Sequence, residues 1–137
     1  MEEMKATAIW VDNVRSVVDN DRGHSVVMDL PTNLGGDDTG ATALEFAVMA
    51  LAGCVATIYE LTLKKMRIEL KSLKVEVEAE KPEGAKTIEK VTVTATVSSD
   101  APEDRLKRAW ELTLQSCPVG VLFEKAGVES SYNLKIA

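Results

Sequence analysis

Two cysteines, Cys54 and Cys117, are the residues whose type and placement are best suited to chemistry. Cys54 ends the run Ala-Leu-Ala-Gly-Cys, and Cys117 opens the run Cys-Pro-Val-Gly 63 positions later. A thiolate is a nucleophile, and two thiols that meet in a fold can cycle between the reduced state and a disulfide. The alternative is that both are inert core residues, because free cysteine is among the most buried residue types. The pattern alone leaves both interpretations open.

Metal and cofactor chemistry find little support in the sequence. Neither cysteine has another cysteine nearby in the sequence, and the single histidine, His24, falls in a turn before a strand, which favours a surface position over a zinc ligand. The glycine-rich stretch at residues 34–40 lacks the lysine and the spacing of a phosphate-binding loop, so we interpret it as a connector. We therefore expect neither a metal nor a cofactor.

The N-terminal third predicts a small antiparallel meander, because short β-branched runs at residues 6–11, 15–18 and 25–28 alternate with Asn/Asp/Gly turns. A long helix follows over about residues 41–66, with Cys54 midway along it. Thr39 or Thr42 could cap its start, and Glu45 lies three positions after Thr42, as in a capping box. The helix is apolar on every face and rich in small residues, so we expect it to be enclosed on all sides, partly by the second chain of a homodimer.

The C-terminal half predicts a hairpin, two helices and a closing strand. Apolar and polar residues alternate over 73–79 and 91–97, as in half-buried strands. Asp100 and Glu103 suggest a helix cap, and one stripe of that helix leads to Cys117. Pro118 starts a short helix at whose N-terminus the backbone N–H groups favour a thiolate. The last strand covers 128–136. The order βββ-α-ββ-αα-β predicts an α+β fold and a single domain over residues 1–137.

Composition and charge exclude several classes of protein. The chain has 137 residues, of which 45% are apolar, and a net charge of −6, so it is neither disordered nor suited to bind nucleic acid unaided. Its longest uncharged run, residues 46–59, is shorter than the roughly 20 residues of a membrane span, so we expect no membrane partner. No basic and apolar N-terminal leader is present, so we expect a reducing, cytoplasmic location, where a permanent disulfide is disfavoured.

Taken together, Glu45, the Ala-Leu-Ala-Gly-Cys run ending at Cys54 and the later Ser-Cys-Pro-Val-Gly run around Cys117 resemble the OsmC/Ohr family. Its members are osmotically inducible protein C and the organic hydroperoxide resistance proteins. The order of elements matches as well, so the resemblance extends over about residues 4–137. It implies an OsmC-like fold in which antiparallel sheets surround long buried central helices, and an intertwined homodimer with active sites at the subunit interface.

The resemblance also implies an activity, the reduction of organic hydroperoxides by a cysteine thiolate as a defence against oxidative stress. Position by position, Cys54 matches the peroxidatic cysteine, Cys117 the resolving cysteine and Arg15 the arginine that holds the thiolate. The implied partners are an organic hydroperoxide and a dithiol reductant such as a protein-bound lipoyl group. A guanidinium favours the thiolate and stabilises the departing alkoxide, and a second thiol traps the sulfenic acid as a disulfide.

One position departs from the family pattern. Ten residues before the reactive cysteine, the peroxidase branches carry a glutamate that pairs with the arginine, and here that residue is Leu44. Glu45 lies about 180° from Cys54 around an ideal helix and would point to the opposite face. Asp37 or Asp38 in the preceding loop could replace the missing carboxylate. The alternative function is therefore a dimeric OsmC-like module that binds a small apolar or thiol-bearing ligand without turnover.

The two tryptophans, Trp10 and Trp110, have a less specific interpretation. Large aromatic rings contribute most to cores and interfaces, so we expect both to lie in the core or in a subunit interface, with the lining of an apolar substrate pocket as the alternative for either.

Overall fold

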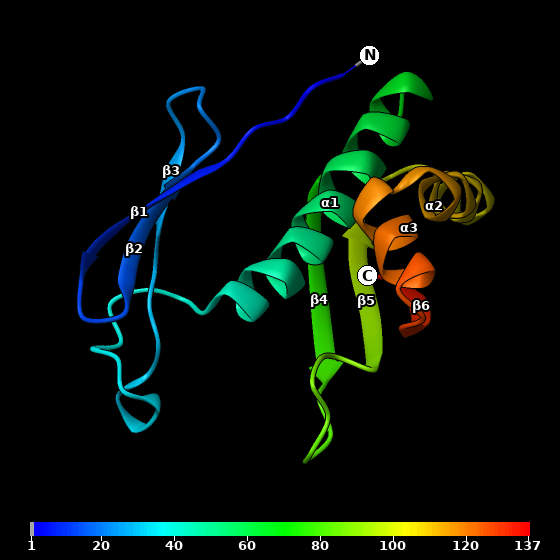
Figure 1. Cartoon of the computed structure of the whole chain (residues 1–137). Helices are drawn as coiled ribbons and strands as arrows, with labels where there is room; N and C mark the ends of the chain where they lie inside the picture. The colour runs from blue at the N-terminus through cyan, green and yellow to red at the C-terminus, as the bar shows by residue number, and fades with distance from the viewer. Residues whose placement is uncertain (1) are drawn as a thin grey trace. The chain divides into compact units, whose positions relative to one another are not determined.

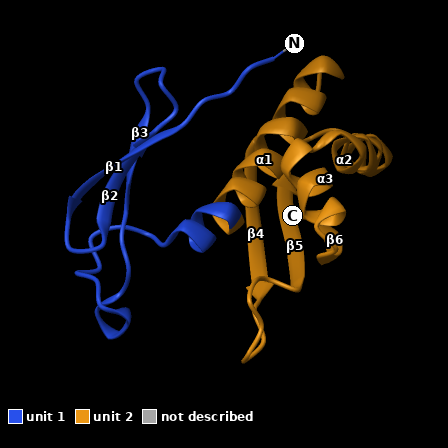
Figure 2. Cartoon of the chain, in the orientation of Figure 1, with its two compact units in different colours: residues 1–47 blue, residues 48–137 orange. Residues whose placement is uncertain are grey.

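The computed structural model describes residues 2–137 and confirms the mixed α+β class (Figure 1). Met1, the first residue of the predicted domain, lies outside the described residues. The chain falls into two compact units, one ending at Ala47 and one running from Val48 to Ala137 (Figure 2). That the whole chain acts as a single domain stays a prediction.

The first unit contains the predicted meander of β1 (Thr7–Asp12), β2 (Arg15–Asp19) and β3 (Ser25–Met28), followed by the short 3-10 helix η1 (Thr32–Leu34). Both strand pairs are antiparallel. Asn13 takes the left-handed conformation, with φ of 44°, in the tight turn between β1 and β2, a conformation that asparagine tolerates better than most residues. Every residue of β1 is exposed, so this sheet has no buried face of its own in the single chain.

The long helix α1 (Ala43–Lys65) begins in the first unit and continues into the second. The predicted capping box is confirmed: the Thr42 N–H donates to Glu45 Oε1 at 2.9 Å, and the Glu45 N–H donates to Thr42 Oγ1 at 3.1 Å. The single chain does not enclose α1 on all sides, and its enclosure with the help of a second chain stays a prediction. Only one stripe is buried, made of residues four apart along the helix: Leu51, Val55, Tyr59 and Leu63.

By length and composition alone, α1 is also long and apolar enough to cross a membrane. This is weak support for a membrane location, because core helices of soluble proteins meet the same requirement.

The second unit is built on the sheet β4-β5-β6, formed by β4 (Ser72–Glu80), β5 (Lys90–Ser98) and β6 (Glu129–Ile136). The predicted hairpin is confirmed as the antiparallel pair β4–β5, and β6 joins β5 in parallel. Alternate side chains of the central strand are completely buried, namely Val91, Val93, Ala95 and Val97. The helices of this unit cover that face (Figure 1), which makes it the hydrophobic core.

Two further helices, α2 (Glu103–Ser116) and α3 (Pro118–Lys125), follow β5. The predicted apolar stripe of α2 is confirmed, because Leu106, Ala109 and Thr113 are fully buried. The prediction that Asp100 caps α2 is wrong. Pro102 occupies the N-cap position without a side-chain cap bond, which leaves Asp100 two residues outside the helix, where its carboxylate accepts from Lys71 Nζ at 2.8 Å.

Candidate active site

The two cysteines meet in the second unit. Cys54 is half-buried midway along α1, and Cys117 is 2% exposed at the N-cap of α3. The Cys117 thiol donates to the Cys54 sulfur, with 3.1 Å between the two Sγ atoms. A disulfide requires about 2.05 Å, so a movement of about 1 Å would join them. The arrangement can therefore cycle between two thiols and one disulfide without refolding.

Contacts between α1 and α2 hold the helix that carries Cys54 in place. The Tyr59 hydroxyl, five residues after Cys54, donates to the Leu106 carbonyl at 3.0 Å. The Tyr59 and Trp110 rings pack edge to face, with centroids 5.4 Å apart and an interplanar angle of 89°, a favourable geometry for aromatic pairs. Burial raises the pKa of Tyr59 to about 12. Its hydroxyl thus stays protonated and keeps donating at all ordinary pH values.

The surroundings of Cys117 act on the pKa of its thiol in opposite directions. Burial is the largest, followed by the hydrogen bond to Cys54, and together they raise the pKa of the Cys117 thiol to about 11. The N-terminus of α3 acts in the opposite direction, since the Gly120 N–H donates to Cys117 Sγ at 3.4 Å. The helix N-terminus therefore favours the thiolate, as its sequence position suggests, but burial outweighs it. Cys117 is protonated at neutral pH.

A residue that sequence reasoning missed, Tyr132, lies beside this pair. It is half-buried on β6, opposite the fully buried Val93 of β5, so it faces the helix-covered side of the sheet. A Cβ atom built on Gly120 would come within 3.0 Å of the Tyr132 hydroxyl oxygen and 3.5 Å of Cys117 Sγ. Both atoms therefore pack against the same glycine. No local pattern marks Tyr132, because its place depends on the pairing of β5 with β6.

Arg15, which the resemblance assigns to the thiolate, lies at the start of β2 in the first unit. Its guanidinium is held by Asp12 through two parallel hydrogen bonds, Nε to Oδ1 at 2.9 Å and Nη2 to Oδ2 at 2.6 Å. Asp12 and Arg15 are cross-strand partners on either side of the β1–β2 turn. The hydrogen bonds to Asp12 raise the pKa of Arg15 further above its ordinary value. Asp12 and Arg15 flank a predicted tight turn in the sequence, and this spacing is the signal that could have revealed Asp12 as the partner of Arg15.

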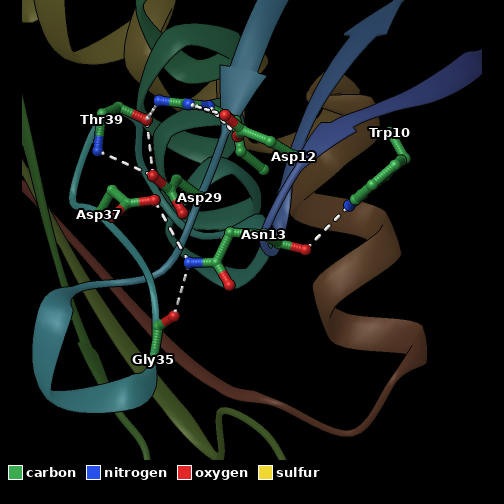
Figure 3. A network of polar contacts seen from close by, with 8 residues as sticks. Trp10, Asp12, Asn13, Asp29, Gly35, Asp37 and Thr39 are labelled. Atoms are coloured by element: carbon green, nitrogen blue, oxygen red, sulfur yellow. Dashed lines mark hydrogen bonds and ion pairs between the residues drawn. The ribbon is translucent and has the colours of Figure 1, made fainter.

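The suggestion that Asp37 or Asp38 replaces the missing carboxylate as the partner of Arg15 is wrong, because the carboxylate that bonds directly to Arg15 is that of Asp12. Asp37 instead accepts from Asn13 Nδ2 at 3.3 Å, and the same nitrogen donates to the Gly35 carbonyl at 2.9 Å (Figure 3). These contacts fasten the glycine-rich loop to the β1–β2 turn. The loop connects β3 to α1, as predicted. These hydrogen bonds also hold it in a defined conformation within the first unit.

A second carboxylate, Asp29, supports Arg15 through Thr39, and Figure 3 shows Asp29 and Thr39 side by side. Arg15 Nη1 donates to Thr39 Oγ1 at 3.1 Å, and that hydroxyl donates to Asp29 Oδ2 at 2.6 Å. Asp29 is only 3% exposed. Hydrogen bonds from the hydroxyl and the backbone N–H of Thr39, with a further one from the Leu30 N–H, lower the pKa of Asp29 to about 2. Asp29 is therefore ionised across the neutral range.

The histidine and the two tryptophans lie in surroundings that do not suggest a chemical role. His24 lies in an exposed turn with its ring 3.0 Å from Asn20 Nδ2. Trp110 is a core residue as expected, but Trp10 is 68% exposed, with its indole N–H donating to the Asn13 carbonyl at 2.8 Å. Within residues 2–137, no group of three or more His, Cys, Asp or Glu side chains is arranged to hold a metal ion.

Comparison with protein families supports the resemblance found in the sequence. The family model described as OsmC-like protein matches residues 35–133. No curated protein sequence matches the chain.

The solved structures that match have the same fold over essentially their whole length. An OsmC-like protein from Mycoplasma pneumoniae has a TM-score of 0.85 at 15% identity, covering 99% of this chain and 98% of that one. An organic hydroperoxide resistance protein OsmC from Legionella pneumophila has a TM-score of 0.72 at 16% identity, covering 98% of each chain. An organic hydroperoxide resistance protein from Elizabethkingia anophelis has a TM-score of 0.70 at 19% identity, covering 100% and 98%.

Proposed function

The chain belongs to the OsmC-like protein family, and from that premise we propose that it is a thiol-dependent peroxidase that reduces organic hydroperoxides in defence against oxidative stress. The observation that carries the proposal is the 3.1 Å separation of the Cys54 and Cys117 sulfur atoms. Two inert core thiols have no need to meet, whereas a peroxidatic and a resolving thiol must come together. The similarity to proteins named for hydroperoxide resistance supports the same activity.

The surroundings of the two thiols support an assignment of roles. Cys54 is half-buried and so more accessible to a substrate than Cys117, which is 2% exposed and protonated at neutral pH. In the proposed reaction the Cys54 thiolate attacks the terminal peroxide oxygen, the O–O bond breaks, and the alkoxide takes up a proton and leaves as an alcohol. Cys54 is then a sulfenic acid.

Resolution follows within the same chain. The Cys117 sulfur attacks Cys54 Sγ, the S–S bond forms, and the hydroxide of the sulfenic acid leaves with the thiol proton as water. A dithiol of the lipoyl class then reduces the disulfide by exchange and returns both thiols. Such a cycle suits the reducing, cytoplasmic location that the sequence favours, because a pool of reduced thiols is present there.

Arg15 completes the proposal as the cation that favours the Cys54 thiolate and the departing alkoxide. The support for this role is the family resemblance together with the rigid hold that Asp12 and Thr39 give its guanidinium. A bidentate carboxylate pair fixes the orientation of an arginine more firmly than a single contact. In the peroxidase branches a helix glutamate pairs with the arginine, and Leu44 stands at that position here. We infer that Asp12 takes over the role of this glutamate.

We also propose that the working form is a homodimer. The first unit exposes large apolar side chains on β1 and β3, among them Ile9, Trp10 and Val26, and α1 exposes Met49 and Leu61. Exposed apolar residues gathered in this way are typical of protein interfaces. A second copy of the chain is the partner that the OsmC/Ohr resemblance implies.

The activity is tested by the consumption of cumene hydroperoxide with dihydrolipoamide as reductant. We expect turnover by the wild-type protein and none by Cys54→Ser. Cys117→Ser should reduce about one equivalent of hydroperoxide and stop at the sulfenic acid, which a 1,3-dicarbonyl probe would trap. Absence of any consumption by folded wild-type protein would contradict the proposal.

The role of Arg15 is tested with the second-order rate constant for oxidation of Cys54. Arg15→Ala should lower it by about 100-fold, the usual effect of removing a group that stabilises developing charge. Asp12→Asn should lower it less, by about tenfold, because the arginine keeps its Thr39 contact. Arg22→Ala, which removes an exposed arginine from the same unit, is the matched control and should leave the rate unchanged. Equal rates for Arg15→Ala and Arg22→Ala would remove Arg15 from the mechanism.

A further inference from the structure

We propose that the hydroxyl of Tyr132 carries the proton of the resolving step, passing it from the Cys117 thiol to the hydroxide that leaves Cys54. This inference rests on the proposed peroxidase function and adds a residue from β6 to it. It starts from a difficulty in the resolving step, in which a buried thiol must attack a sulfenic acid while its proton reaches the leaving oxygen. The structure places one hydroxyl where it can serve that transfer.

The difficulty follows from the burial of Cys117. With a pKa of about 11, only about one Cys117 in ten thousand is a thiolate at pH 7. The neutral thiol is a far weaker nucleophile. Attack on Cys54 is therefore slow unless the proton leaves the sulfur as the S–S bond forms. A group that accepts this proton and gives another to the leaving hydroxide removes the obstacle.

Tyr132 is placed to be that group. A Cβ built on Gly120 would lie 3.0 Å from the Tyr132 hydroxyl oxygen and 3.5 Å from Cys117 Sγ, so the two atoms are at most 6.5 Å apart. One bridging water molecule can span such a separation between a hydroxyl oxygen and a sulfur and pass the proton between them. Cys54 Sγ, which carries the leaving hydroxide, is a further 3.1 Å from Cys117 Sγ.

The absence of a side chain at Gly120 is part of the arrangement. Contacts of 3.0 Å are tighter than ordinary Cβ contacts, so alanine at this position would push against the tyrosine hydroxyl. Gly120 also donates its N–H to Cys117 Sγ at 3.4 Å. One residue thus gives the sulfur a hydrogen bond and leaves room for the hydroxyl, which accounts for a buried glycine in the first turn of α3.

The charged groups around Tyr132 keep its hydroxyl protonated. Burial raises its pKa above the ordinary value, and the negative charge of Glu124 on α3 raises it further, as does a thiolate when one forms at Cys117 or Cys54. A contact with Ser130 on the same strand acts weakly in the opposite direction. The phenol therefore begins the step neutral, with one proton to give and a lone pair to accept another.

The transfer balances without a further reagent. The S–H proton of Cys117 moves to the Tyr132 oxygen, and the phenolic proton moves to the hydroxide leaving Cys54. The S–O bond of the sulfenic acid breaks, the S–S bond forms and water is released. Tyr132 ends the step unchanged, and the two sulfur atoms together have taken up the oxidation that the hydroperoxide supplied.

The test separates the two chemical steps in a single turnover with one equivalent of cumene hydroperoxide. The rate of sulfenic acid formation is measured with the 1,3-dicarbonyl probe, and the rate of disulfide formation by rapid quenching with an alkylating agent and intact mass. We expect Tyr132→Phe to leave the first rate within twofold of wild type and to slow the second by about tenfold or more. Gly120→Ala should slow the second step as well.

The matched control is Ser131→Ala, which removes an exposed hydroxyl from the other face of the same strand, one residue before Tyr132. We expect it to resolve at the wild-type rate. If Tyr132→Phe forms the disulfide less than threefold more slowly than Ser131→Ala, the inference is wrong while the peroxidase function stands. If wild-type protein forms no sulfenic acid, the proposed function itself fails.

The pH profile distinguishes a proton carrier from a packing residue. In wild-type protein the resolving rate should change little between pH 6 and 9, because the thiol proton is handed over within the site. In Tyr132→Phe the rate should depend on free thiolate and rise about tenfold per pH unit over that range. Parallel profiles for the two proteins would overturn the inference.

Discussion

The central strand of the second unit, β5, buries alternate side chains completely, whereas β1 in the first unit exposes Ile9 and Trp10 at 60% and 68%. Both strands are rich in β-branched or aromatic residues. In the second unit helices supply the cover, whereas the loop that follows β3 in the first unit is held in place by polar contacts of Asp29 and Asn13. A strand sequence therefore does not reveal whether its apolar face is covered within the same chain.

The comparison also separates two kinds of support for the candidate chemistry. The thiol pair depends on hydrophobic packing, because Cys54 and Cys117 are held by helices that cover an apolar sheet. Arg15 depends on ion pairing and hydrogen bonds to Asp12 and Thr39, which are sensitive to charge and pH. Substitutions in the core of the second unit should therefore affect folding stability, whereas substitutions around Arg15 should affect the response to charge and pH.

The largest expected effect is that of a charge in the core of the second unit. Val93 is fully buried at the centre of β5, and Val93→Asp would place an unpaired carboxylate there, at a cost of at least about 4 kcal/mol. We expect the variant to be unfolded or barely folded in urea denaturation followed by circular dichroism. Thr94→Asp, one residue along on the other face, is the control. A Val93→Asp variant as stable as Thr94→Asp would contradict the packing described for this sheet.

A smaller effect is expected at the exposed tryptophan of the first unit. If the homodimer covers this sheet, Trp10→Ala removes an aromatic anchor and weakens association by about 30-fold or more. Light scattering over a dilution series measures the dissociation constant. Lys74→Ala, on the polar face of β4, should leave association unchanged. Equal dissociation constants for the two variants would place the interface elsewhere.

The polar support of the first unit should fail in acid. The folded-state pKa of Asp29 is about 2, below its ordinary value of 3.8, so its contribution to stability is present above about pH 4 and is lost as pH falls toward 2. In a Trp110→Phe background the fluorescence of Trp10 reports on this unit alone. Asp29→Asn should remove the acid transition between pH 4 and 2. An unchanged transition in that variant would assign it to other carboxylates.

The smallest effect contrasts two helix starts. Thr42→Ala breaks the reciprocal bonds with Glu45 and should cost about 1 kcal/mol in the free energy of unfolding. Asp100→Ala removes only an exposed ion pair with Lys71 and should cost less than about 0.5 kcal/mol. Chemical denaturation of the two variants measures the difference. A larger cost at Asp100 would reinstate it as a cap.

Local patterns in the sequence predicted the elements well, since alternation marked β4 and β5 and the Thr42–Glu45 spacing marked the start of α1. They misplaced the start of α2, because the fixed backbone of Pro102 rather than the Asp100 side chain defines it. The contact of Arg15 with Thr39 and the position of Tyr132 depend on loop folding and strand pairing. These juxtapositions arise from tertiary structure, and no spacing in the chain encodes them.

The meeting of the two thiols is the central claim, and its most direct test is peptide mapping by mass spectrometry after one equivalent of cumene hydroperoxide. Wild-type protein is compared with Cys54→Ser. The account predicts a Cys54–Cys117 disulfide that forms in wild type, with loss of two hydrogen atoms, and is absent from the variant. Two thiols that stay reduced in wild-type protein at excess hydroperoxide would contradict it.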